Sequence, residues 1–217
     1  MKIQRYAVYL KRVRKMHIPT DDSHFIEIKT FDEDHKESLT ANGFDSKKWI
    51  YVPGEYRDYR YLLGTRGENP VICIGINPST AEPENLDNTL KSVERLAHFN
   101  GYDSFIMFNV YAQRATRPKD MDAEVNTFLH NENMKAFEYV LSHSKNATVW
   151  AAWGSIVNER GYLKSCVREM IEIGEKYNAK WVHAGKLLKN GHPHHPLYLC
   201  KTTEFEDYDI KTYVNSL

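Results

Sequence analysis

Uninterrupted apolar runs, each followed by a segment with helical spacing, recur along the chain from residue 70 onwards. A continuous run of this kind is typical of a strand that is buried on both faces of a parallel sheet. The pattern therefore predicts four core strands, at residues 71–76, 104–111, 147–154 and 180–185.

The segments between these strands have the spacing of amphipathic helices. Residues 86–102 form one such segment, and Asn100-Gly101 supplies its stop. Residues 128–144 and 156–177 predict two more helices, the second with a weak point at Gly161. Because strands alternate with helices, we expect an α/β fold of three layers, in which a four-stranded, mainly parallel sheet is flanked by helices.

The pattern before residue 60 is less regular. Alternating apolar positions predict strands at residues 5–18 and 24–31, and Pro53-Gly54 predicts a turn. We interpret residues 1–59 as a partly β N-terminal extension and residues 60–217 as the α/β domain. The basic run at residues 11–15 is more typical of a solvated face than of a nucleic-acid contact.

Composition narrows the class of protein. The 217 residues are 41% hydrophobic and 27% charged, as in a globular domain, and the 29 basic residues balance 29 acidic ones. This balance argues against a dedicated high-affinity binder of duplex nucleic acid. The N-terminus lacks the apolar run of a signal peptide and no run is long enough to span a membrane, so we expect a cytoplasmic protein without a membrane partner.

The three cysteines, Cys73, Cys166 and Cys200, lie far apart in the chain and form no CxxC pair. This usage is typical of a reducing compartment and gives no zinc ribbon or cluster motif. We therefore expect no cofactor.

Conspicuous residues follow each predicted core strand. They are Gly75-Ile76-Asn77-Pro78, Asn109, Trp153-Gly154 and a histidine-rich loop at residues 190–196. In a parallel α/β sheet, ligands bind beyond the carboxyl ends of the strands. These residues therefore predict one site at that edge.

Asn77 opens the turn that follows the first core strand. Its side chain and the nearby backbone N–H groups would be presented at the sheet edge, where Asn77 could hold a water or a substrate group. The alternative is a simple helix cap, with Ser79 and Glu82 spaced as a capping box.

Asn109 ends the second core strand. A buried carboxamide needs partners, and its paired donor and acceptor suit either the Watson–Crick edge of a base or a neighbouring loop. Arg114 and Arg117 follow in the same stretch and could hold phosphate or lie in solvent. The nearby sequence EYRDYRY, at residues 55–61, could stack on bases or form a strand with one wet face.

The histidine-rich loop, NGHPHHP, admits three interpretations. His192, His194 and His195 could chelate a metal, but the prolines stiffen the backbone and no second ligand motif supports this. A structural turn is the second interpretation. We favour the third, a single functional histidine, and choose His195 because His195-Pro196 leads into the apolar stretch Leu197-Tyr198-Leu199.

Residues 60–199 resemble the DUF 1643 family, a bacterial and phage family whose name states no activity. The stretches that support this resemblance appear in the family's order and with similar spacing. They are YRYLL, GINPSTAEPENLDNT, FNVYAQRATRP, NENM, AAWG and KNGHPHHPLYL.

A more distant resemblance is to the uracil-DNA glycosylase superfamily, which has a four-stranded parallel α/β sheet. GINPS resembles the first motif of its mismatch-specific branch, FNVYAQRATRP a strand and loop of its thermophilic-type enzymes, and HPLYL the His-Pro motif with its DNA-wedging loop. The resemblance implies that Asn77 positions the attacking water, that Asn109 binds the base and that His195 stabilises charge on the departing base.

The same resemblance implies further contacts. The base would also lie against Gly75, Ile76 and Pro78, and the phosphate or nucleic-acid contacts would be Ser79, Thr80, Arg114, Arg117, Leu197 and Tyr198. The sequence departs from the superfamily pattern in three places. Ser79 replaces the glycine of the first motif, no serine follows His195-Pro196, and the cysteines cannot form the iron–sulfur cluster of the thermophilic branch.

The sequence thus predicts a base-recognising N-glycosidic hydrolase that acts on a nucleic acid or a nucleotide. Cleavage of this bond develops negative charge on the base, so a donor aimed at the base oxygen stabilises the transition state more than the ground state. The alternatives are a non-catalytic module that binds a nucleotide or a modified base, and a metal-dependent hydrolase that uses the histidine-rich loop.

Overall fold

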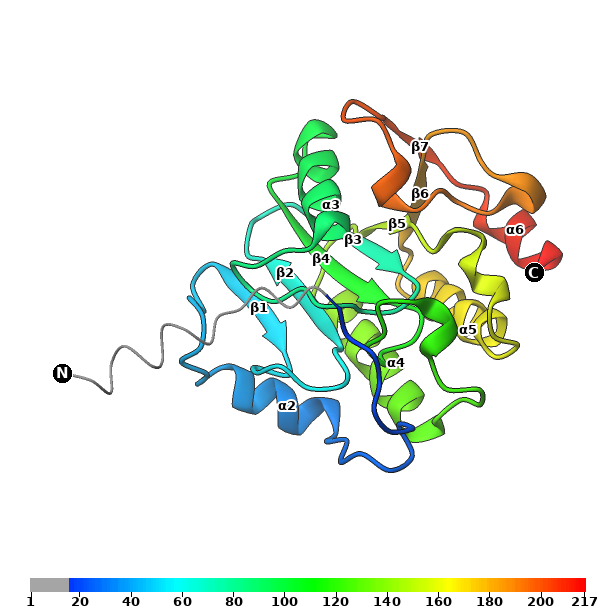
Figure 1. Cartoon of the computed structure of the whole chain (residues 1–217). Coiled ribbons are helices and arrows are strands. Elements are labelled where there is room, and N and C mark those ends of the chain that lie inside the picture. Colours follow the sequence, from blue (N-terminus) through cyan, green and yellow to red (C-terminus); the bar gives the residue numbers. More distant parts are fainter. Residues whose placement is uncertain (1–15) are drawn as a thin grey trace.

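A seven-stranded mixed sheet lies at the centre of the computed structural model, which describes residues 16–217 (Figure 1). The strand order is β1-β2-β4-β3-β5-β6-β7. The strands are β1 (Trp49–Val52), β2 (Leu62–Thr65), β3 (Pro70–Gly75), β4 (Ser104–Asn109), β5 (Thr148–Ala151), β6 (Lys180–Ala184) and β7 (Phe205–Asp207).

The four strands expected from the apolar runs are β3, β4, β5 and β6, and each pairs in parallel with its neighbour. The sheet nevertheless contains more strands than the four that we expected. β1 and β2 extend the sheet beyond β4, and β7 extends it beyond β6, all by antiparallel pairing. These added strands are only three or four residues long, so they give little periodic signal.

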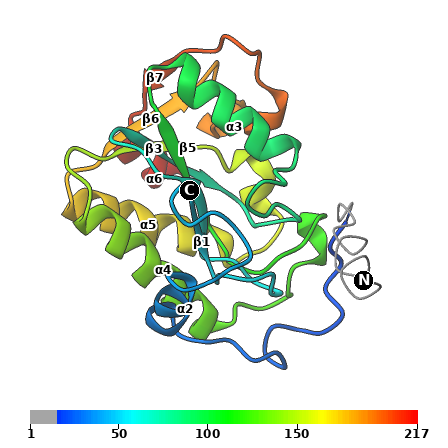
Figure 2. The same cartoon turned by 90° about the vertical axis from the view of Figure 1, so that its left-hand side faces the viewer.

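Helices cover both faces of the sheet, which confirms the α/β class. α3 (Asn88–Phe99) lies on one face, whereas α2 (Phe31–Ser38), α4 (Thr127–Ser142) and α5 (Leu163–Lys176) lie on the other (Figure 2). α6 (Ile210–Ser216) packs beside α5 near the C-terminus. Single 3₁₀ turns connect these elements: η1 (Pro118–Asp120), η2 (Gly154–Asn158), η3 (Lys189–Gly191) and η4 (Pro196–Tyr198).

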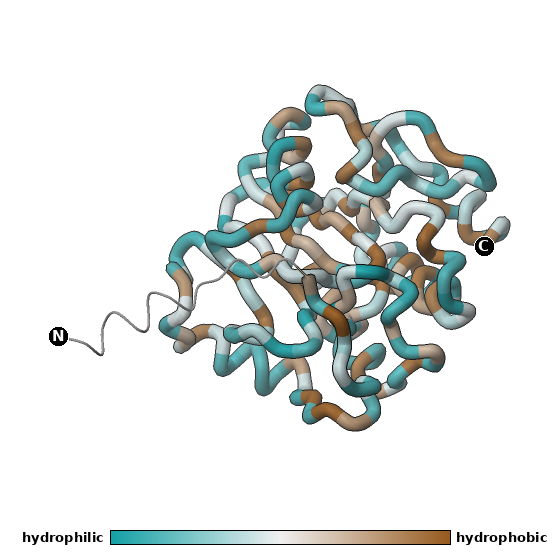
Figure 3. The backbone as a smooth tube through the Cα atoms, viewed as in Figure 1, coloured by the Kyte–Doolittle hydropathy of each residue, from teal (hydrophilic) through white to brown (hydrophobic). Residues whose placement is uncertain are grey.

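The strands alternate between two hydrophobic cores. In β3, Ile72 and Ile74 join the core beneath α4 and α5, whereas Val71 and Cys73 join the core beneath α3. Hydrophobic residues are accordingly frequent along the central strands (Figure 3). Because both faces of β3 and β4 are buried, the polar groups at their carboxyl ends stand out as exceptions.

The strand predicted at residues 24–31 is wrong. Residues 25–30 have no regular structure, and α2 begins at Phe31, directly after the N-cap Thr30. The Thr30 side chain accepts from the Glu33 N–H, and Glu33 accepts from the Thr30 N–H, so a complete capping box fixes the helix start. Local capping therefore overrides the alternating apolar pattern.

Only some of the other predictions for the N-terminal segment fall within the described residues. The basic run at residues 11–15, and most of the strand expected at 5–18, lie outside the described residues. Residues 53–55 form the expected bend after β1, and β1 belongs to the same sheet as the core strands. Among residues 16–217, no helix has both the length and the apolar character that crossing a membrane requires.

Candidate functional site

A cavity of about 340 Å³ opens at the carboxyl ends of β3 and β4. This volume lies within the range of small-ligand sites. Ten of the twelve residues that the sequence singled out line it: Gly75, Ile76, Asn77, Pro78, Ser79, Thr80, Asn109, His195, Leu197 and Tyr198. Segments that are more than a hundred residues apart in the chain therefore meet at one edge of the sheet.

Asn109 lies at the end of β4, opposite Gly75 in the parallel register. Its side chain is 1% exposed, and neither Oδ1 nor Nδ2 has a hydrogen-bond partner. Leaving such a group unpaired costs about 1–3 kcal/mol. Because Asn109 lines the cavity, its unpaired acceptor and donor lie beside the space that a ligand would enter.

Asn133 on α4 holds the backbone beneath this side chain. Its Nδ2 donates to the Asn109 carbonyl at 2.9 Å and to the Val110 carbonyl at 3.4 Å. Asn133 is completely buried. The helix thus fixes the strand end through the main chain and leaves the Asn109 carboxamide uncommitted.

Asn77 is oriented by its own amide group. Nδ2 donates to the Ala115 carbonyl at 2.7 Å and to the Pro78 carbonyl at 3.0 Å, which ties the turn after β3 to the loop after β4. With both N–H bonds used, the Asn77 Oδ1 remains as an acceptor at the cavity wall. A water molecule could donate to this oxygen.

His195 enters the cavity from the histidine-rich loop. Its Nδ1 accepts from the Leu197 N–H at 3.3 Å, so in the neutral ring the proton is on Nε2. Burial lowers the pKa of His195, and the charge of Asp87 partly opposes this shift. The site therefore contains a neutral imidazole that can donate from Nε2.

His192, in the same loop, has a structural role. His192 is buried, with Nδ1 bonded to the Tyr213 hydroxyl at 2.9 Å and Nε2 to the Asn158 amide at 3.2 Å. The Tyr213 hydroxyl also accepts from Trp153 Nε1 at 2.9 Å. α6 and the turn after β5 thus hold the loop that presents His195.

The turn after β5 also packs against this loop. Gly154 has a positive φ of 65°, and a Cβ at this position would lie 3.6 Å from the His195 Cβ. Trp153 and Gly154, which the sequence singled out, therefore hold the loop that carries His195. Neither residue lines the cavity.

Arg114 and Arg117 are not among the lining residues. Arg114 is fully buried: it donates to the Ser79 and Ala81 carbonyls and to the Tyr51 hydroxyl, and its guanidinium stacks on Tyr56. Arg117 is exposed and pairs with Asp120 at 2.7 Å.

The capping box at Ser79 and Glu82, which was the alternative interpretation of this turn, is not formed. Ser79 Oγ is instead bonded to Thr116 Oγ1 at 3.0 Å, and α3 begins only at Asn88, capped by Asp87. The turn after β3 is therefore shaped by its contacts with the loop after β4.

Leu197 and Tyr198 form the outer lip of the cavity. Leu197 is 43% exposed and Tyr198 is 76% exposed, and both belong to η4, directly after His195. Two exposed apolar side chains beside the cavity mouth suit a contact with a ligand or partner surface.

Sequence reasoning missed several lining residues. The most informative are Arg60, which lies just before β2, and Asp87, the N-cap of α3. The Asp87 carboxylate accepts from the Leu90 N–H at 2.9 Å. An aspartate directly before a helix is a readable capping signal, so Asp87 could have been found.

A larger hollow of about 470 Å³ lies between α4 and α5. Five of its eight lining residues are lysines or glutamates, and two of them, Lys176 and Glu138, form an ion pair between the helices. Such a lining is typical of a solvated groove. The cavity at the strand ends, with its unpaired carboxamide, is the better candidate site.

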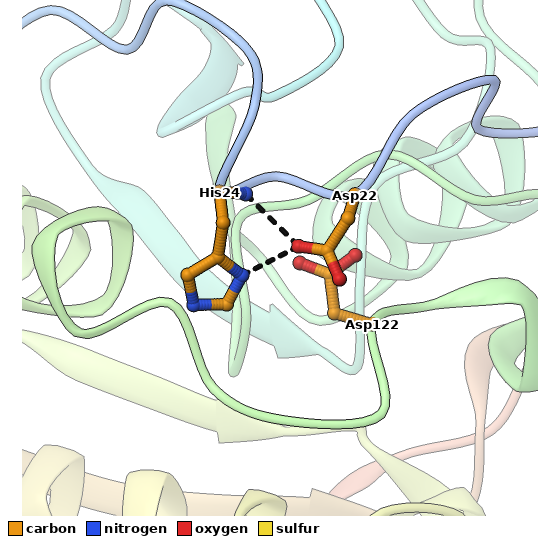
Figure 4. Close-up of side chains that lie close together, drawn as sticks. All are labelled: Asp22, His24 and Asp122. Carbon is orange, nitrogen blue, oxygen red and sulfur yellow. Dashed lines mark hydrogen bonds and ion pairs between the residues drawn. The ribbon is translucent and has the colours of Figure 1, made fainter.

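One group among the described residues brings three metal-type donors together. Donor atoms of Asp22, His24 and Asp122 lie within 4.8 Å of one another (Figure 4). Asp122 already accepts from Ser23 and from the Gln113 amide, and Asp22 accepts from His24. These bonds account for the cluster as a tie between the N-terminal segment and the loop after β4. The histidine-rich loop forms no comparable group within residues 16–217.

Comparison with known proteins gives one match. A family model described as "Protein of unknown function (DUF1643)" matches residues 60–197, well over half of the chain. No curated protein and no solved structure matches. The matched range includes all the lining residues described above except Tyr198.

Proposed function

The chain belongs to the DUF1643 family, and from the cavity itself we propose that it binds a nucleobase and hydrolyses the N-glycosidic bond of a nucleotide or nucleic acid. The observation that carries this proposal is the Asn109 carboxamide, which is buried, unpaired and part of the cavity wall. A carboxamide offers a donor beside an acceptor, which is the pattern on the Watson–Crick edge of a base.

Asn77 and His195 have positions on the cavity wall that suit the reaction. The Asn77 Oδ1 would accept from a water, and this water would attack the anomeric carbon as the bond to the base breaks. The electron pair of that bond leaves with the base, where the His195 Nε2–H would stabilise the developing negative charge. The proton released by the attacking water passes to solvent.

Two features of the fold support this assignment. The four central strands run parallel, as in the superfamily that the sequence resembles. Leu197 and Tyr198 lie at the cavity mouth, where an apolar wedge could fill the gap left by a base that has turned out of the stack.

The first experiment is base release from single- and double-stranded oligonucleotides, and from the matching nucleotides, that contain uracil, hypoxanthine or hydroxymethyluracil. We expect release by the wild type and a loss of about 100- to 1,000-fold in rate with His195→Ala. Asn77→Ala and Asn109→Ala should be impaired as well. Arg117→Gln, outside the cavity, is the matched control. No release by the wild type, or equal release by all variants, contradicts the proposal.

A non-catalytic binding module is the second candidate, and one observation favours it. Asp87 is the only carboxylate among the described residues that line the cavity, and its Oδ1 is used to cap α3. The group proposed to hold the water, Asn77, is a neutral carboxamide, whose oxygen cannot take up the proton of that water. This candidate predicts saturable base binding that Asn109→Ala abolishes, without turnover.

A further inference from the structure

Arg60 is a buried cation at the cavity wall. Its backbone N–H donates to the Ala112 carbonyl at 2.9 Å, which places the side chain beside the loop after β4. The residue is 1% exposed, and one nitrogen, Nη1, donates to the Ala81 carbonyl at 3.2 Å. The Nε is buried without any partner. A guanidinium in this position is costly unless something neutralises it.

The described residues give Arg60 no direct ion pair, and the carboxylate of Asp87 acts on its guanidinium only through longer-range attraction. None of the ion pairs among residues 16–217 includes Arg60, and residues 1–15 contain no aspartate or glutamate. A second buried guanidinium, that of Arg114, donates to the same Ala81 carbonyl at 3.3 Å. Two like charges therefore converge behind the turn after β3.

Burial and the charge of Arg114 lower the pKa of Arg60 to about 9. Arg60 thus remains protonated at neutral pH. The charge of Asp87 opposes this shift but does not cancel it.

Other cavity groups also favour an anion. Asn88 and Thr89, in the first turn of α3, line the same cavity as Arg60. The first N–H groups of a helix have no partner inside the helix, and the helix dipole is positive at this end. Asp87 acts in the opposite direction, because it is the one carboxylate among the cavity-lining residues that the structure describes.

We propose that Arg60, together with the first turn of α3, forms a phosphate subsite of the cavity. The choice of ligand rests on the proposed function: a base held by Asn109 and a phosphate held by Arg60 make the ligand a nucleotide. The phosphate subsite itself does not depend on catalysis. The alternative to a phosphate subsite is that Arg60 has only a structural role, in which it fixes the turn after β3 through its bond to the Ala81 carbonyl.

Calorimetric titration of the full chain separates these alternatives. The probes are inorganic phosphate, deoxyuridine and deoxyuridine 5′-monophosphate. We expect the monophosphate to bind at least about tenfold more tightly than the nucleoside, because charge-assisted hydrogen bonds are the strong ones. Arg60→Gln should remove this difference, so that nucleoside and monophosphate bind with equal affinity. Arg117→Gln, which removes an exposed guanidinium outside the cavity, should preserve it.

Asp87→Asn keeps the test decisive if Arg60→Gln fails to fold. Asparagine caps helices as well as aspartate does, so α3 should be retained while the repelling charge is lost. We expect this variant to bind phosphate and the monophosphate several-fold more tightly, with little change for deoxyuridine.

Two outcomes overturn the subsite: equal affinity of the wild type for nucleoside and monophosphate, or phosphate affinity that does not respond to Asp87→Asn. If phosphate binding depends on Arg60 but deoxyuridine shows no binding, the subsite stands and the base site fails. If deoxyuridine binds and phosphate adds nothing, the base site stands and the subsite fails.

Discussion

Gly75 and Asn109 form the last residue pair of β3 and β4, and a Cβ on Gly75 would lie 3.3 Å from the Asn109 Oδ1. The same Cβ would lie 2.6 Å from the Met107 Cε. The missing side chain at Gly75 therefore leaves room for the uncommitted carboxamide. A small residue at the end of β3 is part of what makes the cavity.

Gly75→Ala should weaken ligand binding while the protein still folds. The methyl group pushes against the flexible end of Met107 and crowds Asn109, which costs stability by about 1–3 kcal/mol. We expect a clear loss of base affinity in calorimetry. Gly161→Ala is the control, because nothing lies within 4 Å of its added Cβ. Wild-type affinity in Gly75→Ala would show that the ligand does not approach this strand end.

Asn133→Ala should lower both stability and affinity. It leaves the Asn109 and Val110 carbonyls without this donor in a buried setting, at a cost of about 1–3 kcal/mol in the free energy of unfolding. Urea unfolding measures the stability change. Asn131→Ala, on the exposed face of the same helix, should have little effect. Equal unfolding midpoints for the two variants would exclude the anchoring role of Asn133.

His195 gives the site a specific pH dependence. Its folded-state pKa is lowered by burial, so the imidazole stays neutral, and binding should persist, below the ordinary histidine value of about 6.5. The unfolded chain binds this proton more readily. His195 therefore reduces stability as the pH falls through 6.5, until its folded form is also protonated.

Histidine NMR titration, with the His195 signal identified by its loss in His195→Gln, measures this pKa. Asp87→Asn removes the charge that opposes the shift, so the pKa of His195 should fall further. A His195 that titrates at or above the ordinary value would contradict the neutral-donor role.

Tyr213→Phe tests the support of the histidine-rich loop. The change leaves buried Trp153 Nε1 and His192 Nδ1 without their shared partner, which costs about 1–3 kcal/mol. Thermal unfolding should show the loss, and turnover should fall because His195 is less firmly held. Unchanged stability and turnover would mean that α6 does not position this loop.

The apolar runs made the parallel centre of the sheet predictable, since strands buried on two faces leave a continuous signal. The polar residues at their ends were predictable for the same reason, and Asn77, Asn109 and His195 do line one cavity. The short edge strands were not predictable, because a strand of three or four residues is too short to show a periodic pattern of hydrophobic residues.

The burial of Arg60 at the cavity wall could not be predicted from the sequence, for a different reason. The stretch EYRDYRY predicts either stacking residues or a strand with a wet face, and nothing in it distinguishes a buried guanidinium from a solvated one. The burial of Arg60 is set by tertiary contacts with Ala81 and Ala112. Conversely, Arg114 has the sequence context of a phosphate contact but donates to backbone carbonyls beneath the turn.

The most direct test of the account is whether the Asn109 carboxamide touches a base. The Asn109 Nδ2 resonances, identified by their absence in Asn109→Ala, should be followed during titration of the full chain with deoxyuridine. We predict that they shift and saturate with the calorimetric binding curve, while those of Asn133, held by backbone carbonyls, move little. Saturable binding that leaves the Asn109 resonances unmoved would contradict the proposed base site.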